Sequence, residues 1–160
     1  MDAFAGSMIA RGPTFGADRE TVTGSLHVLG LPDLEAVHEF VAREPNNRAG
    51  VYGEHRVWRF DNLLGHTMWG FPHAADEPRF LVVALTARRP PPFTGLPAVL
   101  LKRLILYGGL RTLDDAESVG VALAVQTQNR HAVAALIEVA GIGDGAGKVE
   151  IHDWEFGGRR

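Results

Sequence analysis

Gly24–Phe60 reads GSLHVLGLPDLEAVHEFVAREPNNRAGVYGEHRVWRF, and its pattern decides the fold. Alternating apolar residues predict a strand over Thr21–Leu31, and helical spacing predicts a helix over Asp33–Arg43 with Asp33 as its N-cap. Alternation resumes over Val51–Phe60, which predicts a second strand. We therefore expect a strand–helix–strand unit that continues from an earlier strand over Ile9–Thr14.

This unit recurs later in the chain. An offset of 96 positions aligns Trp58 with Trp154 and holds without a gap over most of the sequence. It also pairs Ile9 with Ile105, Gly12 with Gly108, Asp18 with Asp114, Gly24 with Gly120, Ala36 with Ala132, Val37 with Val133, Glu54 with Glu150 and Phe60 with Phe156. Repeats of this kind indicate duplicated structural units.

The second copy predicts a complete β-α-β-β-α-β, or ferredoxin-like, unit. Its expected elements are a strand over Arg79–Arg88, a helix over Thr94–Leu106 ended by Gly108-Gly109, a short strand over Leu110–Leu113, a strand over Val119–Thr127, a helix over Arg130–Val139 capped by Asn129, and a strand over Val149–Phe156.

The first copy of the repeat is shorter than the second at its N-terminal end. Met1 aligns with Pro97, so Asp2–Met8 is at most the end of a helix, and the first strand has no counterpart. We expect a first unit over residues 1–60, a linker packed on the surface over 61–78 and a second unit over 79–160. Because open sheet edges attract pairing, the other copy or a second chain should complete the first unit.

Bulk properties exclude several function classes. A formal net charge of -3 gives no reason to expect a nucleic-acid partner. The absence of cysteine excludes disulfides, thiolate nucleophiles and Cys-type zinc sites. The N-terminus has no secretory signal pattern, and the apolar runs are too short or too interrupted by charge to span a bilayer. We expect a soluble cytoplasmic protein with no membrane partner.

Several motifs resemble a known family. Ala10-Arg11-Gly12-Pro13, Gly24-Ser25-Leu26-His27, Glu44-Pro45 and the strand ending in Trp58 resemble a YCII-related domain. With Asn62-Leu63-Leu64-Gly65 and Thr67-Met68-Trp69, the chain is similar to the tandem YCII-type form of actinobacteria. The resemblance implies a bacterial α+β protein in which two ferredoxin-like sheets form a dimeric α+β barrel around a small-molecule pocket, commonly as a homodimer.

The resemblance also implies small-molecule chemistry of the lyase or isomerase type, with a His–Asp pair as the usual site. The family's usual histidine lies on the first helix, which the first copy lacks, and Phe93–Tyr107 contains none. His27 is then the best histidine, because its strand and neighbours match the family motif. Asp18 would be its acidic partner, although an Asp between two strands is also a common turn former.

The alternation of side chains along the two predicted closing strands indicates which further candidate residues share a face of the sheet. Glu54, Arg56 and Trp58 share one face of the first closing strand, and Glu150, His152 and Trp154 share one face of the second. The Val and Ile residues on the opposite faces should pack on helices. The polar faces should therefore line the hollow of a barrel, where paired carboxylates and histidines suit proton transfer. A purely structural ion-pair network, or a face exposed to solvent, is the alternative.

These patterns give a mechanistic hypothesis. His27 acts as general acid or base, Asp18 or Glu54 orients it, and Arg11 or Arg56 holds an anionic group of the substrate through its planar fork. Ser25, Trp58, Glu150, His152 and Trp154 complete the predicted substrate-binding set, without metal or organic cofactor. The competing hypothesis is a non-catalytic ligand-binding or accessory protein.

Overall fold

The computed structural model describes residues 2–72, 76–87, 91–142, 144–145 and 147–157. Seven strands form one curled sheet in the order β2-β1-β7-β4-β6-β5-β3, with every neighbouring pair antiparallel. The strands are β1 Met8–Phe15, β2 Val22–Leu29, β3 Arg59–Asn62, β4 Arg79–Leu85, β5 Leu104–Arg111, β6 Ser118–Gln126 and β7 Lys148–Trp154.

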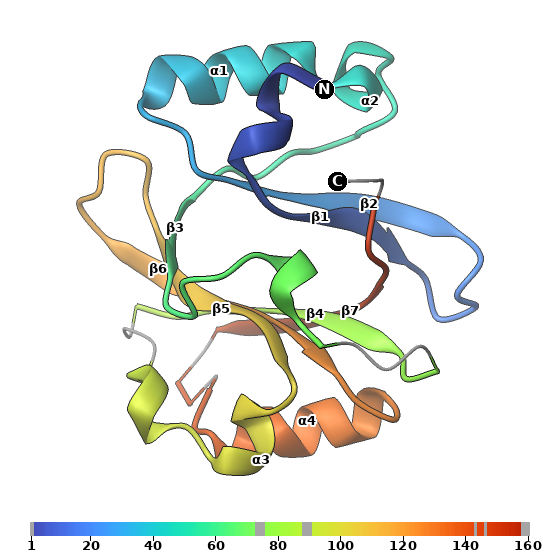
Figure 1. Ribbon diagram of the computed structural model, residues 1–160, viewed down its shortest axis with the longest axis vertical. Coiled ribbons are helices and arrows are strands. Elements are labelled where there is room, and N and C mark those ends of the chain that lie inside the picture. Colours follow the sequence, from blue (N-terminus) through green and yellow to red (C-terminus); the bar gives the residue numbers. More distant parts are fainter. Residues whose placement is uncertain (1, 73–75, 88–90, 143, 146, 158–160) are drawn as a thin grey trace.

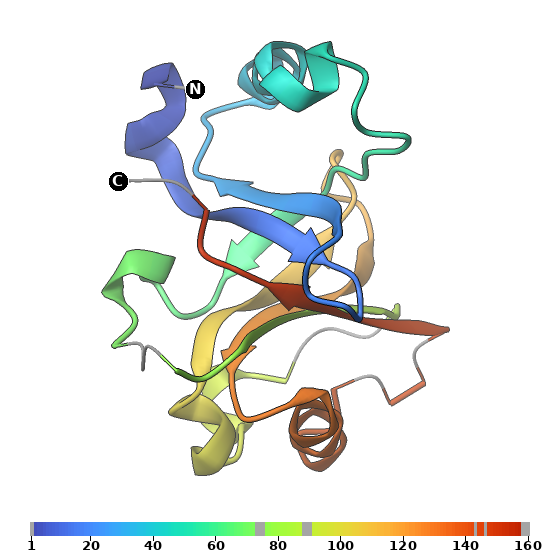
Figure 2. The same cartoon turned by 90° about the vertical axis from the view of Figure 1, so that its right-hand side faces the viewer.

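Short helices cover the outside of this sheet (Figure 1). They are α1 Leu34–Arg43, α2 Pro45–Arg48, α3 Ala98–Leu101 and α4 Arg130–Val139, with 3-10 turns η1 Asp2–Ser7, η2 Met68–Gly70 and η3 Phe93–Gly95. α1 and α2 lie on one side of the strands, and α3 and α4 lie on the other (Figures 1 and 2). The predicted α+β class is confirmed, and the curled sheet fits a barrel-like fold.

Two hairpins, each followed by a helix, build this fold. β1–β2–α1 and β5–β6–α4 have closely matching bounds at the offset of 96 positions. The hairpin turns place Arg19 and Asp115 at matching positive φ angles of 59° and 66°. Asp33 and Asn129 cap the two helices as predicted, each accepting a hydrogen bond of 2.9 Å from the amide three residues on. The match is consistent with the predicted duplication, which stays a prediction.

The closing strand of each half pairs with the hairpin of the other half. β7 pairs with β4 along its length and with the end of β1, where Thr14 faces Trp154. β3 pairs with β5, where Phe60 faces Leu110. The two halves are thereby joined into one continuous sheet.

Two glycines at equivalent positions allow these strands to approach. A Cβ atom on Gly12 would lie 1.8 Å from the carbonyl oxygen of Glu155, and one on Gly108 would lie 2.1 Å from that of Asp61. Any side chain at either position would push the closing strand away.

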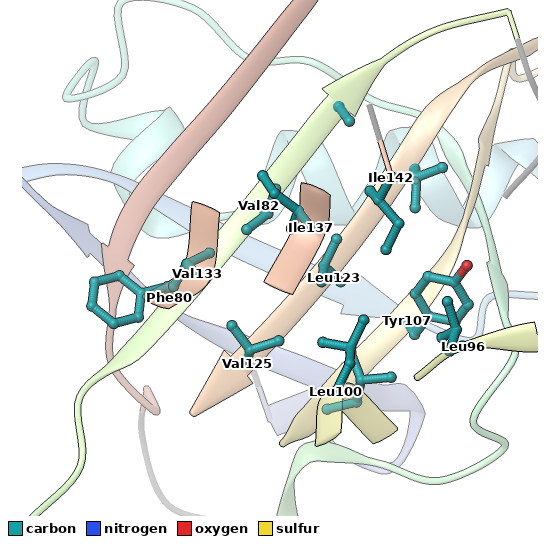
Figure 3. Close-up of a cluster of buried hydrophobic side chains, with 13 residues drawn as sticks. Phe80, Val82, Leu96, Leu100, Tyr107, Leu123, Val125, Val133, Ile137 and Ile142 are labelled. Atoms are coloured by element: carbon teal, nitrogen blue, oxygen red, sulfur yellow. The ribbon is translucent and has the colours of Figure 1, made fainter. Parts of the chain in front are cut away.

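Apolar side chains fill both sides of the sheet. The outer cluster packs β4, β5 and β6 against α3 and α4 (Figure 3), with Val82, Leu100, Tyr107, Leu123 and Val133 fully buried. Burial also raises the pKa of Tyr107 to about 12, although its hydroxyl donates to the Pro91 carbonyl at 2.7 Å. The inner cluster includes Ala10, Val28, Leu81, Ala122 and Trp154. The inside of the curled sheet is therefore packed over most of its length.

The predicted helix over Thr94–Leu106 is wrong. Only Ala98–Leu101 is α-helical, and Leu104–Arg111 forms β5, which passes through Gly108-Gly109. The leucine spacing suited a helix, but β6 and β3 supply hydrogen-bond partners on both sides of this stretch. A continuously apolar run fits a buried strand equally well.

The predicted closing strand over Val51–Phe60 is mostly wrong, because β3 covers only Arg59–Asn62. Among the residues that the structure describes, no strand lies beside β2 as β4 lies beside β6, so residues 51–58 lack the partner that β7 has in β4.

The expected surface linker over residues 61–78 contributes to the core instead, since Met68 and Phe71 are buried in the inner cluster. β4 ends at Leu85, and the predicted end of that strand at Arg88 lies outside the described residues. Within the described ranges, every helix is too short or too polar to cross a bilayer.

Candidate functional site

A row of polar side chains leads along the inner face of β7 into the core. Glu150 and His152 lie opposite Val83 and Leu81 of β4, two members of the inner cluster. Ile151, on the other face, packs against the outer cluster under α4, as the alternation predicted. The row ends at Trp154, which is fully buried.

Glu150 is the centre of an ion-pair network. Its two carboxylate oxygens accept hydrogen bonds of 3.1 and 2.9 Å from the two terminal nitrogens of Arg56, and Lys148 Nζ lies 2.8 Å away. These bonds, led by those from Arg56, hold the pKa of the Glu150 carboxyl well below its usual range, against the opposing effect of burial. Hydrogen bonding to Glu150 in turn raises the pKa of Arg56. The carboxylate is therefore ionised and fixed in direction.

His152 completes this network. Its Nε2 lies 3.2 Å from Oε2 of Glu150, and its side chain is 34% exposed. An ionised carboxylate can only accept a hydrogen bond, so the neutral ring places its proton on Nε2. Nδ1 then carries the free lone pair.

An open depression of about 550 Å³ lies beside His152. It is lined by Thr14, Phe15, Gly16, Ala17, Thr23, Arg130, Ile151 and His152. The Thr14 and Thr23 hydroxyls are 3.2 Å apart, and Arg130 is held by the Asp153 carboxylate at 2.9 Å. A second depression, of about 460 Å³ around Val99 and Arg103, contains none of the predicted site residues. We therefore assign the candidate site to the depression at His152.

A separate polar group surrounds His27 on the outer face of the β1–β2 hairpin. His27 lies opposite Arg11 in the strand register, its Nδ1 is 3.4 Å from the Ser25 hydroxyl, and its ring meets the edge of Phe40 at 5.5 Å. Burial lowers the pKa of His27; the nearby Glu44 carboxylate opposes this and Arg11 adds to it. His27 is thus a neutral, partly buried ring beneath α1.

The two groups lie on opposite faces of the sheet. Leu26 and Val28, which flank His27, belong to the inner cluster, so His27 and Ser25 face outward. Arg11 also lies on the outer side, where its Nε donates to the Gly157 carbonyl at 2.8 Å. The inward-facing network at Glu150 does not include them.

Asp18 and Glu54 lie away from His27. Asp18 accepts hydrogen bonds from the Thr21 hydroxyl at 2.6 Å and from the amides of Thr21 and Glu20, which fixes the hairpin turn. The bonds from Thr21, the hydroxyl first, lower the pKa of Asp18. Glu54 is exposed and acts on the network only through its charge, which helps to raise the pKa of Arg56. Trp58 stacks beneath Arg56, whose guanidinium carbon lies 5.3 Å from the ring centroid.

Residues 3–61 match the family of the YCII-related domain. Within these residues the chain is similar to the YCII-related domain. The match spans the β1–β2 hairpin, α1, α2 and the start of β3, and so includes His27 and Arg56. No curated protein and no solved structure gives a significant match. The predicted tandem arrangement and the homodimer stay predictions.

The network at Glu150 joins the YCII-related domain to the rest of the chain. Arg56 lies within the domain, whereas Glu150 and His152 belong to β7, outside the matched residues. The family match therefore bears on only one side of the candidate site.

Sequence reasoning missed several residues of both groups. Arg130, Thr14 and Thr23 line the depression, and no motif in the sequence signalled them. Glu44, which is buried near His27, appeared in the sequence only as part of the Glu44-Pro45 motif. Its oxygens instead cap α2, where one accepts from the Asn47 amide at 2.6 Å.

Proposed function

We propose that this protein binds a small carboxylate-bearing molecule in the depression beside His152. There it promotes cofactor-free acid–base chemistry of the lyase, dehydratase or isomerase type, in bacterial metabolism. The observation that carries the proposal is the 3.2 Å contact between His152 Nε2 and a Glu150 carboxylate already fixed by Arg56.

This pair has the properties of an acid–base centre. The Glu150 carboxylate accepts a hydrogen bond from the Nε2–H group of His152. The lone pair on Nδ1 can therefore take a proton from a carbon next to a carbonyl group. The ionised carboxylate stabilises the imidazolium that forms, as an acidic partner does in other histidine-based sites. The imidazolium then returns the proton, either to a leaving group in an elimination or to another carbon in an isomerisation.

The surroundings of His152 supply the means of binding a substrate. Arg130 provides positive charge in the lining of the depression, and the paired hydroxyls of Thr14 and Thr23 provide donors and acceptors. Phe15 and Ile151 give the depression apolar walls. Such a mixture suits a small organic acid.

His27 is a second candidate centre. Its neutral ring could serve as a general base, and Arg11 across the hairpin could hold an anionic group. Its nearby carboxylate is Glu44, however, in place of the proposed partners Asp18 and Glu54. We therefore rank His152 first.

Deuterium exchange into a substrate distinguishes the centre at His152 from the centre at His27. A set of small 2-oxo and hydroxy carboxylates in D2O is followed by NMR for deuterium incorporation next to the carbonyl or hydroxyl carbon. We expect His152→Asn to reduce incorporation by about 100-fold or more, with His27→Asn as the matched control. Loss of activity in His27→Asn alone would move the site to the outer face. Binding without deuterium incorporation for any compound would leave a non-catalytic binding protein.

A further inference from the structure

The depression of about 460 Å³ around Val99 and Arg103 has no part in the function proposed above. It lies where the end of α3 meets the start of β5 and the segment that precedes β4. Its lining includes two basic residues, Lys102 and Arg103, and one acidic residue, Glu77, in a chain whose formal net charge is -3. The volume lies within the range of pockets that hold small organic molecules.

The structure holds Arg103 in one orientation. Its backbone amide donates to the Leu100 carbonyl at 2.8 Å, and its carbonyl accepts from the Gln126 amide at 3.0 Å. In its side chain, Nη1 donates to the Glu77 carboxylate at 3.3 Å and to the Gln126 carbonyl at 3.2 Å. Gln126 is 3% exposed and fixes Glu77 in turn, because its side-chain amide donates to the Glu77 carbonyl at 2.9 Å.

The other edge of the Arg103 guanidinium is unused. Nε and Nη2 donate to none of the residues that the structure describes, and the side chain is 31% exposed. Together these two nitrogens form an edge that can bind both oxygens of a carboxylate, or two oxygens of a phosphate. The ion pair with Glu77 engages only Nη1, so it leaves this edge available.

Lys102 and Val99 border the same depression on either side of an anchored residue. Leu100 is fully buried in the outer cluster (Figure 3), which fixes α3 on the sheet. The Lys102 ammonium makes no hydrogen bond or ion pair within the described part of the chain. Val99 is 54% exposed, so an apolar group placed over it would remove apolar surface from water.

We propose that this depression binds a small organic oxyanion, a carboxylate or a phosphate monoester carried on an apolar body. The Nε–Nη2 edge of Arg103 binds two of its oxygens, and Lys102 supplies a second positive charge. The apolar body covers Val99. The site is separate from the depression at His152, and the proposal does not depend on catalysis there.

Two probes test the proposal. Phenyl phosphate and benzoate are titrated separately into the isotope-labelled full chain and followed by NMR, and the tighter of the two identifies the preferred oxyanion. We expect saturable shift changes at the amides of Val99, Lys102 and Arg103 and at the Nε–H group of Arg103. Inorganic phosphate lacks the apolar body and benzyl alcohol lacks the charge, so each should bind at least about tenfold more weakly.

Three variants assign the contacts. Arg103→Lys keeps the charge and can keep the ion pair with Glu77, but it lacks the two-nitrogen edge and should weaken binding by at least about tenfold. Lys102→Gln removes a charge that has no partner among the described residues, so it should fold normally and weaken binding about three- to tenfold. Arg48→Gln, on α2 across the sheet, is the charge-matched control and should bind normally.

Several results would overturn the proposal. Shift changes confined to residues 14–17 and 150–153 would place the probes at His152 instead. Unchanged binding by Arg103→Lys would show that the guanidinium edge is not used, and equal weakening by Lys102→Gln and Arg48→Gln would show only a general effect of charge. His152→Asn should leave the shift changes at Val99 and Arg103 intact, so failure of the proposed function and failure of this site are separate results.

Discussion

The guanidinium of Arg56 holds the carboxylate of Glu150 through two hydrogen bonds, of 3.1 and 2.9 Å. The two residues are 94 positions apart, and one precedes β3 whereas the other lies in β7. Since residues 51–58 form no strand, this ion pair fixes the segment against the sheet. It also sets the charge and direction of the carboxylate beside His152.

Replacing Arg56 should destabilise the fold. We expect Arg56→Met to lower the free energy of unfolding by about 1–2 kcal/mol, because a mostly buried carboxylate loses a two-point partner that is itself partly exposed. Urea denaturation measures the change. Arg43→Met removes an exposed ion pair with Glu39 and should cost no more than about 0.5 kcal/mol. Equal effects of the two substitutions would contradict a special role for Arg56.

Glu150 should make the protein sensitive to acid. Its pKa is lower in the folded state than the ordinary value of 4.5, so the unfolded chain takes up its proton first as the pH falls. The stability that the carboxylate contributes is therefore complete above about pH 5 and is lost progressively below it. Unfolding free energies between about pH 6 and pH 3 should fall less steeply in Glu150→Gln. Parallel curves for the two proteins would contradict the lowered pKa.

His27 should destabilise the protein in mildly acidic solution. Burial lowers its pKa from the ordinary 6.5, so the folded ring stays neutral while the unfolded chain binds a proton. Above about pH 6.5 the ring is neutral in both the folded and the unfolded state, so its protonation does not affect stability. As the pH falls from there through the folded-state pKa, the unfolded chain binds the proton first and the free energy of unfolding decreases.

His27→Leu should remove that loss, because Leu123 occupies the equivalent buried position in the other half. Thermal unfolding at about pH 5.5 and pH 8 measures the difference. An NMR titration of the ring that gives a pKa above 6.5 would contradict the prediction, whatever the variant does.

Gly108 should tolerate no side chain. A Cβ atom there would lie 2.1 Å from the Asp61 carbonyl oxygen and 2.6 Å from the Phe60 ring, so Gly108→Ala must displace β3 from β5. We expect a loss of about 2–3 kcal/mol in unfolding free energy. Gly53→Ala, with no atom within 4 Å of the new methyl group, should change stability by no more than about 0.5 kcal/mol. A comparable loss in both variants would show that β3 is not held at this point.

Local signals predicted the parts of the fold that depend on local interactions. The caps Asp33 and Asn129 fixed the starts of α1 and α4, and the turns near Asp18 and Asp114 fixed the two hairpins. These features need only neighbours within a few residues. The elements that failed, over Thr94–Leu106 and Val51–Phe60, depend on which strand lies beside them, and the sequence does not carry that information locally.

The same distinction applies to the candidate site. Alternation placed Glu150, His152 and Trp154 on one face, and the structure has them in a row along β7. It could not show that Arg56 reaches Glu150, nor that His27 lies on the opposite side of the sheet. Both depend on how the sheet curls after pairing.

The crossed pairing of β3 with β5 and of β7 with β1 has a consequence for how the chain can be divided. A cut after Gly65 would yield two pieces, each holding the closing strand that the other needs. Neither piece should fold alone, yet the two should co-purify when expressed together, as in fragment complementation. The two halves of the chain should therefore separate only when the β3–β5 and β7–β1 pairings are both broken.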